Sequence, residues 1–185
     1  AEALAGAIRD GRCLYAFGAT HSFIMVEEMV YRTGGLMLVN PVYPHGINLF
    51  VRPLTATSQL ERLHGLGREL LGTVPVRTGD VVIIVSTSGR NPVPIDVAIA
   101  ARERGAVTVA VTSLAYSGGV GSRHQSGKKL LELCDIVIDN GAPHGDAAAE
   151  IPGFPQRVGP LSTVTGCAVV NAMVAETVAI LVRQG

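Results

Sequence analysis

The residues whose chemistry stands out first are the hydroxyls of the segment VSTSGRNP. Ser86, Thr87 and Ser88 directly follow the apolar run VVIIV, and a helix-like stretch begins a few residues later. A helix N-terminus presents unpaired N–H groups and about half a positive charge, and hydroxyls add donors without charge. We therefore predict a phosphate-binding loop, in which Gly89 allows close approach and Asn91 adds a donor. The simpler alternative is a helix cap, which needs only one hydroxyl.

Two other segments place hydroxyls at the start of an expected helix. FGATHSF contains Thr20 and Ser22, and GPLSTVTG contains Ser162 and Thr163. One cap would explain each segment alone, but three such starts in one chain favour convergence on one anion. Ser22, Ser162 and Thr163 are therefore further candidate phosphate ligands.

The elements that must position these loops alternate along the chain. Short apolar runs separated by helix-like stretches predict a parallel sheet covered on both faces. Such sheets bind ligands outside the carboxyl ends of their strands, where the first two hydroxyl segments fall. The predicted strands are Cys13–Phe17, Leu36–Asn40, Val81–Val85, Thr108–Thr112 and Ile136–Asp139. The predicted helices are AEALAGAIRDG at the start, Phe23–Thr33, Thr57–Leu71, Pro94–Arg104, Gly127–Leu133 and Ser162–Arg183.

Two predicted connections are long. Residues 41–56 and 140–160 both reach the length, beyond about 12–15 residues, at which loops usually have a function. The chain opens on Ala rather than Met and is helix-like from the outset, so we expect the natural chain to extend further.

Composition limits the kinds of partner. The 185 residues, 48% of them hydrophobic, predict one domain over residues 1–185 with a substantial core. The 15 basic and 15 acidic residues cancel without forming runs, which argues against binding to nucleic acid or a membrane surface. Zero net charge and a mean hydropathy of +0.36 favour a homo-oligomer.

Cysteine spacing and absent motifs narrow the chemistry. Cys13, Cys134 and Cys167 lie in apolar segments without CxxC spacing, so we expect buried, reduced thiols in a cytoplasmic protein. The chain has no GxxxxGK[ST], HExxH or GxSxG motif, and no GxGxxG follows the first strand. Nucleotide binding, zinc proteolysis and serine hydrolysis therefore lack support, and we expect no cofactor.

Longer stretches resemble a known family. FGATHS, GDVVIIVSTSGRNPVPIDVAIAARERGAVTVAVTS and CDIVIDN resemble the sugar isomerase (SIS) domain over essentially the whole chain. Within that family, EEMVYRTGGL, SRHQSGKKL, GDAAAEIPG and VGPLSTVTG resemble a group of phosphosugar-binding proteins related to phosphoheptose isomerase. The resemblance implies an α/β three-layer sandwich with a five-stranded parallel sheet, the flavodoxin-like SIS fold, and a homodimer or homotetramer.

The resemblance also implies roles for particular residues. Ser86, Thr87 and Ser88 would hold the phosphate of a sugar phosphate, and Ser22 would contact the ligand. Family members usually carry a second glycine where this chain has Thr20, so the first loop departs from the pattern.

An aldose–ketose isomerase needs a base, usually a carboxylate, that moves a proton between C1 and C2. Glu27 and Glu28 lie five and six residues beyond Ser22, so one of them could face the pocket. The alternative is that one is solvated and the other pairs with Arg32 at helical spacing. Glu150, in the second long loop, is either a third candidate base or a surface acid.

Histidines offer an acid or a metal ligand. His45, in the first long loop, is the candidate acid for ring opening unless it is merely exposed. His144, Asp146 and Glu150 share a loop, but their spacing does not support a metal site and we expect none. His124 lies in the basic stretch SRHQSGKK, which either reaches the ligand of a neighbouring subunit or faces solvent.

The sequence thus predicts a phosphosugar-binding SIS protein that isomerises a sugar phosphate by proton transfer. One alternative is a lyase or etherase on an amino-sugar phosphate, which would use the same carboxylate. Another is a non-catalytic phosphosugar sensor, although no DNA-binding motif or basic patch accompanies the domain.

Overall fold

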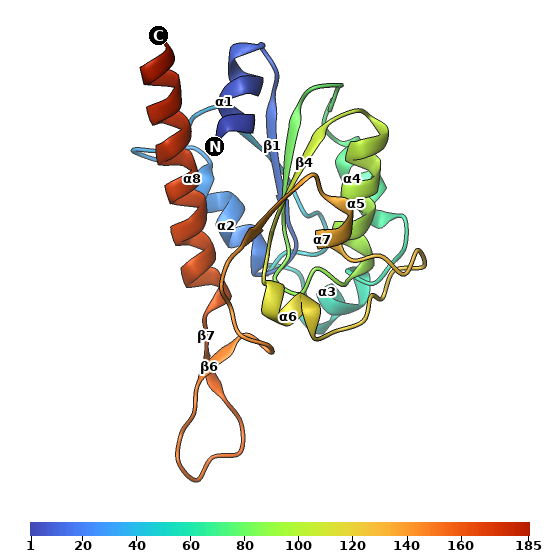
Figure 1. Ribbon diagram of the computed structural model, residues 1–185. Helices are drawn as coiled ribbons and strands as arrows, with labels where there is room; N and C mark the ends of the chain where they lie inside the picture. The colour runs from blue at the N-terminus through green and yellow to red at the C-terminus, as the bar shows by residue number, and fades with distance from the viewer.

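Five parallel strands form the central sheet of the computed structural model, which describes residues 1–185 (Figure 1). Their order is β2-β1-β3-β4-β5, so the direction of winding reverses between β1 and β3. The register pairs Gly18 with Val85, which brings the carboxyl ends of these two strands together. The strands are β1 (Leu14–Gly18), β2 (Val39–Val42), β3 (Val81–Val85), β4 (Val107–Thr112) and β5 (Ile136–Asp139).

Strand β3 illustrates why the sheet is covered on both faces. All five of its residues are Val or Ile, and all are buried. Val81, Ile83 and Val85 belong to one hydrophobic core, whereas Val82 and Ile84 belong to the other. This alternation follows because successive side chains of a strand point to opposite faces, and both faces are apolar.

Helices form the two outer layers (Figure 1). The first layer contains α1, α2 and α8, and the second contains α4, α5 and α7. The short α3 and α6 lie at the end of the sheet where β4 runs into α6. The helices are α1 (Glu2–Arg9), α2 (Ser22–Met29), α3 (Thr55–Leu60), α4 (Leu66–Gly72), α5 (Pro92–Glu103), α6 (Leu114–Gly118), α7 (Leu130–Leu133) and α8 (Ser162–Gln184).

The predicted α/β sandwich with five parallel strands is confirmed, although several boundaries differ. The predicted helix Thr57–Leu71 is interrupted at Gly65, whose φ of +86° is a left-handed conformation that separates α3 from α4. Strand β2 begins at Val39 rather than Leu36, and α2 ends at Met29 rather than Thr33. The helix expected over residues 127–133 shortens to α7.

The prediction that all three cysteines are buried is wrong for Cys13. Its position just before β1 leaves it exposed, whereas Cys134 and Cys167 are partly buried. All three thiols are free.

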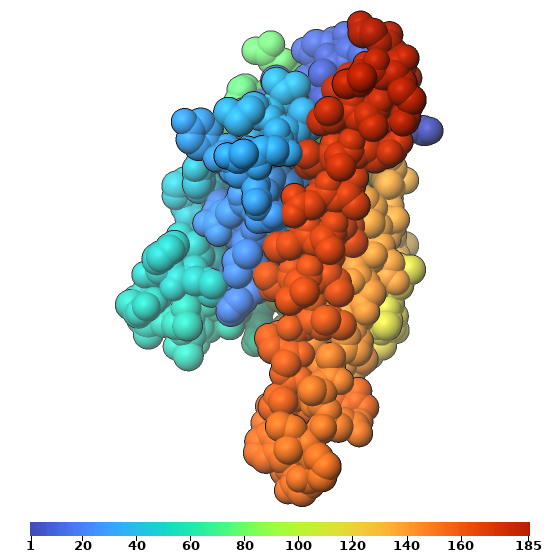
Figure 2. All heavy atoms as spheres, turned by 90° about the vertical axis from the view of Figure 1, so that its left-hand side faces the viewer, coloured from blue at the N-terminus to red at the C-terminus, as the bar shows by residue number.

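The predicted loop over residues 140–160 contains a hairpin. Strands β6 (Ala147–Ala149) and β7 (Val158–Pro160) pair antiparallel, and the segment between them projects from the body of the molecule (Figures 1 and 2). Ile151 and Phe154 are exposed near its tip. The hairpin leads directly into α8.

Helix α8 lies along the outside of α2 and α1 (Figure 2). It is 23 residues long and contains an 18-residue window with a mean hydropathy of 1.8, which is sufficient, by length and composition alone, for a membrane-spanning helix. Val170, Met173 and Val174 pack into the core that α2 shares. Gly166 permits this approach, because a Cβ there would lie 2.0 Å from the Sδ of Met25. In this fold α8 is a packed element of the outer layer.

Candidate functional site

A pocket of about 190 Å³ lies at the edge of the sheet where β1 and β3 end. The three hydroxyl-bearing segments that were expected to converge all contribute to its wall. Their lining residues are Thr20, Ser22, Ser86, Thr87, Ser88 and Ser162. Elements far apart in the sequence therefore meet at one polar cavity.

The loop after β3 is held in place from behind. The carbonyl of Thr87 accepts hydrogen bonds from the N–H of Ser113 at 3.0 Å and the hydroxyl of Thr112 at 3.1 Å. Gly89 has a φ of +57°, and a Cβ there would lie 3.2 Å from atoms of both Thr112 and Leu130. Only glycine therefore suits this position without displacement.

The same loop has backbone hydrogen-bond donors that are not used within the chain. The backbone N–H groups of residues 87–90 donate to no acceptor within the chain, while Ser86 N–H bonds back to Val111. Successive free N–H groups with adjacent hydroxyls form a concave anion-binding surface. The loop is thus chemically suited to hold a phosphate.

The loop after β1 is equally constrained. Gly18 closes β1, and a Cβ there would lie 2.5 Å from the carbonyl oxygen of Ser22. Thr20 adopts a φ of +52° and donates its N–H to the carbonyl of Ile47 at 2.8 Å. Thr20 takes a left-handed conformation that favours glycine, and its side chain lines the pocket. The departure from the family pattern thus brings a further hydroxyl to the site.

The start of α8 contributes differently from the expectation. The carboxylate of Asp146 accepts from the N–H groups of Leu161 and Ser162 at 3.1 and 2.7 Å. It also accepts from the Ser162 hydroxyl at 2.7 Å. Ser162 and Asp146 line the pocket, but Thr163 does not. Because Asp146 compensates the positive end of α8, we expect this helix start to bind a phosphate less readily than the loop after β3 does.

Glu61 is the second carboxylate, beside Asp146, that shares a pocket with the hydroxyl loops. It follows α3, where its N–H donates to the carbonyl of Thr57 at 2.9 Å. Its own carbonyl accepts from the N–H of Val93 at 3.2 Å. The first turn of α5 therefore fixes the backbone that carries this side chain.

The environment of Glu61 favours a base. Burial raises the pKa of its carboxyl above the usual value, against the opposing effects of a hydrogen bond with Asn91 and the charges of Arg123 and Arg62. A carboxylate with a raised pKa takes up a proton more readily. Asn91 also lines the pocket, together with Tyr116 and His21.

Two of the expected bases lie elsewhere. Glu28 forms an ion pair with Arg32 and accepts from the Asn171 side chain at 2.7 Å, so its carboxylate is occupied on the outside of α2. Glu150 pairs with Arg157 in the projecting hairpin and is mostly exposed. Neither lines the pocket of about 190 Å³.

Glu27 and His45 meet in a neighbouring pocket of about 250 Å³. Its walls include the rings of Phe23 and Tyr43, whose centroids are 5.8 Å apart. Thr20 lines both pockets, so they adjoin. The expected base and acid are therefore beside the hydroxyl loops rather than among them.

The residues considered as metal ligands do not form a cluster. Asp146 binds the start of α8, Glu150 pairs with Arg157, and the ring of His144 lies 5.1 Å from that of Tyr116.

Sequence reasoning missed Glu61 because it fell inside a helix that was expected to continue to Leu71. The segment HGLG, which begins three residues after it, was the available signal for a break. Tyr116 was missed because α6 was read as loop.

Residues 1–113 match the family model of the SIS domain. A UPF0309 protein of Shouchella clausii is 45% identical over 185 residues, which is 100% of this chain and 75% of the relative. A UPF0309 protein of Oceanobacillus iheyensis is 44% identical with the same coverage. The chain belongs to the SIS domain family and, within it, to the UPF0309 proteins.

Solved structures share the fold at low sequence identity. Phosphoheptose isomerase GmhA of Neisseria gonorrhoeae has a TM-score of 0.60 at 18% identity, covering 96% of this chain and 82% of that one. A phosphoheptose isomerase of Francisella tularensis gives 0.57 at 10%, covering 95% and 81%. NanR of Vibrio vulnificus, complexed with ManNAc-6P, gives 0.53 at 16%, covering 99% and 55%.

Proposed function

We propose that this protein binds a phosphorylated sugar and interconverts its aldose and ketose forms. The observation that carries the proposal is the presence of Glu61 and the Ser86–Ser88 loop in one pocket. The loop offers hydroxyls and free N–H groups to the phosphate, and the carboxylate has a raised pKa. The structural likeness to phosphoheptose isomerases supports this reading through the fold.

The proposed reaction needs no co-reactant. Glu61 takes the proton from the carbon beside the carbonyl, the carbonyl oxygen gains a proton, and an enediol forms. Glu61 then returns its proton to the former carbonyl carbon as the neighbouring hydroxyl loses its own, which completes the interconversion. The phosphate, held by Ser86, Thr87 and Ser88, fixes the distance between the sugar and the base.

Ring opening requires an acid near the ring oxygen. His21 lines the same pocket as Glu61, whereas His45 and Glu27 line the adjoining one. We propose His45 as the ring-opening acid if the sugar extends past Thr20 into the adjoining pocket. We propose His21 as that acid if the sugar stays within the pocket of Glu61. His21→Asn and His45→Asn, assayed on the cyclic and open-chain forms of one substrate, separate the two.

The test of catalysis is turnover in D₂O, followed by NMR, on hexose, pentose and heptose phosphates. We expect one solvent deuteron at the exchanging carbon, and Glu61→Gln should lower the rate by about 10² to 10⁴-fold. Glu69→Gln, an exposed carboxylate on α4, is the matched control. Binding without exchange would instead favour a phosphosugar sensor, and loss of a substituent would favour a lyase or etherase.

We also propose that the protein is a homodimer or homotetramer. Val164, Val178 and Val182 are exposed on α8 at 67%, 41% and 76%. With Ala168, Asn171 and Ala175, also exposed, they repeat at four- and three-residue intervals along one stripe. Such a seam of small and apolar residues is the pattern by which two helices pack together.

Light scattering after size exclusion tests the assembly. Val178→Glu should shift the protein towards a monomer, whereas Leu63→Glu, which is 50% exposed at another site, should not. A monomeric parent protein would contradict the proposal.

A further inference from the structure

Two arginines lie around Glu61 and a third lies beside Arg123, and none of the three forms an ion pair with a carboxylate. Arg62 follows Glu61 in the chain, Arg90 lies in the loop after β3, and Arg123 lies in the basic stretch before α7. The ion pairs of the chain involve other arginines. The Nε of Arg90 is buried with no hydrogen-bond acceptor, which is costly for a charged group.

Arg123 is connected to the pocket through a single side chain. Its Nη1 donates to the Oδ1 of Asn91 at 2.9 Å, and its backbone N–H donates to the carbonyl of Arg90 at 2.8 Å. Asn91 lines the pocket beside Ser88. Arg123 therefore adjoins the loop that is proposed to hold the phosphate, and Arg90 is part of that loop.

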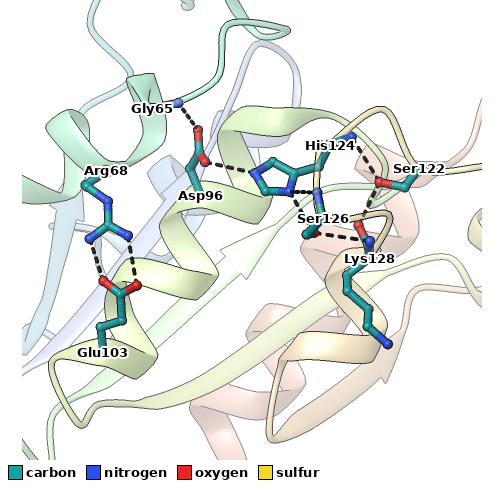
Figure 3. Close-up of polar contacts among 8 residues, drawn as sticks. All are labelled: Gly65, Arg68, Asp96, Glu103, Ser122, His124, Ser126 and Lys128. Carbon is teal, nitrogen blue, oxygen red and sulfur yellow. Dashed lines mark hydrogen bonds and ion pairs between the residues drawn. The ribbon is translucent and has the colours of Figure 1, made fainter.

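A buried contact between His124 and Asp96 holds the basic stretch in this place (Figure 3). The Nε2 of His124 lies 3.1 Å from Asp96 Oδ1, and Asp96 Oδ2 accepts from the N–H of Gly65 at 2.7 Å. On its other side, His124 Nδ1 lies 2.7 Å from the hydroxyl of Ser126. Asp96 thus joins α5, the start of α4 and the basic stretch, which fixes the backbone beside Arg123.

The three charges affect one another. Burial lowers the pKa of Arg123, and so do the charges of Arg90 and Arg62, while Tyr116 and Glu61 act in the opposite direction. Arg123 and Arg62 therefore share one partly buried carboxylate, and Arg90 adds a third positive charge beside Arg123. An additional anion would relieve this repulsion and would supply the acceptor that Arg90 lacks.

We propose that Arg90 and Arg123, with Arg62 at the edge, form a second anion subsite beside the Ser86–Ser88 loop. The ligand is then a sugar phosphate that carries a second anionic group, either a carboxylate or another phosphate. This inference rests on the proposed function, because it assigns the first phosphate to the Ser86–Ser88 loop. It narrows the substrate class from sugar phosphates to doubly anionic ones.

Isothermal titration with matched probes tests the subsite. Glucose 6-phosphate is compared with 6-phosphogluconate, in which C1 is a carboxylate instead of an aldehyde. Fructose 6-phosphate is compared with fructose 1,6-bisphosphate, which carries a second phosphate. We expect one doubly anionic probe to bind at least about tenfold more tightly than its singly anionic counterpart, as charge-assisted bonds to arginine do. The pair that shows the preference identifies the second group.

Variants locate the effect. Arg123→Gln and Arg90→Gln should each weaken the doubly anionic probe about tenfold and the singly anionic probe less than about threefold. Arg123→Lys, which retains a charge, should fall between, and Arg9→Gln on α1 is the distant control. The unfolding midpoint of each variant confirms that it is folded.

Two results would overturn the subsite. The first is equal affinity of the parent protein for both members of each probe pair. The second is an equal loss of affinity for the singly and the doubly anionic probe in Arg123→Gln. Failure of the proposed function has a different signature, since Ser86→Ala with Ser88→Ala would then leave every sugar phosphate bound as before.

Discussion

The carboxylate of Asp146 accepts hydrogen bonds from both the backbone N–H and the hydroxyl of Ser162, each at 2.7 Å. Both residues line the polar pocket. Because Asp146 already binds the start of α8, the donors that remain for an anion are those of the loop after β3. The positive end of α8 is compensated, whereas residues 87–90 keep unbonded N–H groups. The anion should therefore sit on the loop after β3.

Removing this cap should destabilise the protein. Asp146→Ala should lower the free energy of unfolding by about 1 to 2 kcal/mol, because the first N–H groups of α8 lose their acceptor. Urea unfolding followed by circular dichroism measures the change. Glu150→Ala, in the same hairpin, removes only an exposed ion pair and should cost less than about 1 kcal/mol. Equal losses would mean that the hairpin, not the cap, matters.

Glu61→Gln should stabilise the protein at neutral pH although it lowers turnover. A carboxyl whose folded pKa is raised favours the folded state below its unfolded pKa, and that contribution is lost as pH rises through the folded pKa. The variant should therefore melt above the parent protein near pH 7, and the difference should shrink towards pH 4. Thermal unfolding across this range, with Glu69→Gln as control, measures it. A variant that melts lower at pH 7 would contradict the assignment.

Gly89→Ala should weaken both folding and ligand binding. The left-handed backbone and the 3.2 Å contacts predict a loss of about 1 to 3 kcal/mol in stability. Gly118→Ala is the matched control, because its φ is ordinary and nothing lies within 4 Å of the added Cβ. If both variants unfold at the parent temperature, the loop tolerates a side chain and the close packing behind it is not required.

His124→Ala should leave the carboxylate of Asp96 without one of its partners. We expect a loss of about 2 to 3 kcal/mol, since both groups are nearly buried. Asp96→Asn in the same background should recover part of it, because the unpaired charge is gone. A double-mutant cycle from urea unfolding gives the coupling energy between the two residues. Strict additivity would show that the contact in Figure 3 contributes nothing.

The layered fold followed from local pattern, whereas the site depended on contacts between distant segments. Strand β3 (Val81–Val85) was predictable because a buried parallel strand requires continuous apolar residues. The hydroxyls of Ser86–Ser88 could be recognised because they directly follow this apolar run. The place of Glu61 in the site was not predictable. A helical pattern does not show that a carboxylate will be buried once α5 packs against the end of α3.

The sequence also did not determine which partner each charged side chain would take. The spacing of Glu28 and Arg32 permitted an ion pair, which the structure contains. Asp146 was considered as a metal ligand from its loop neighbours, yet it binds the start of a helix fifteen residues away. Its φ of +66° is a left-handed conformation, at the end of a turn in which its N–H donates to the carbonyl of Pro143 at 2.9 Å.

The central claim is that Ser86, Thr87 and Ser88 hold the phosphate of a sugar, and thermal unfolding with a ligand panel tests it most directly. The panel contains hexose, pentose, heptose and amino-sugar phosphates, each with its unphosphorylated parent. A ligand at 100 times its Kd adds about 2.7 kcal/mol to stability, or about 5 to 10 °C in Tm for a chain of this size. We predict that at least one phosphosugar raises Tm, that its parent sugar does not, and that Ser86→Ala with Ser88→Ala removes the shift. A shift that survives in this double variant, or equal shifts with the parent sugar, would contradict the claim.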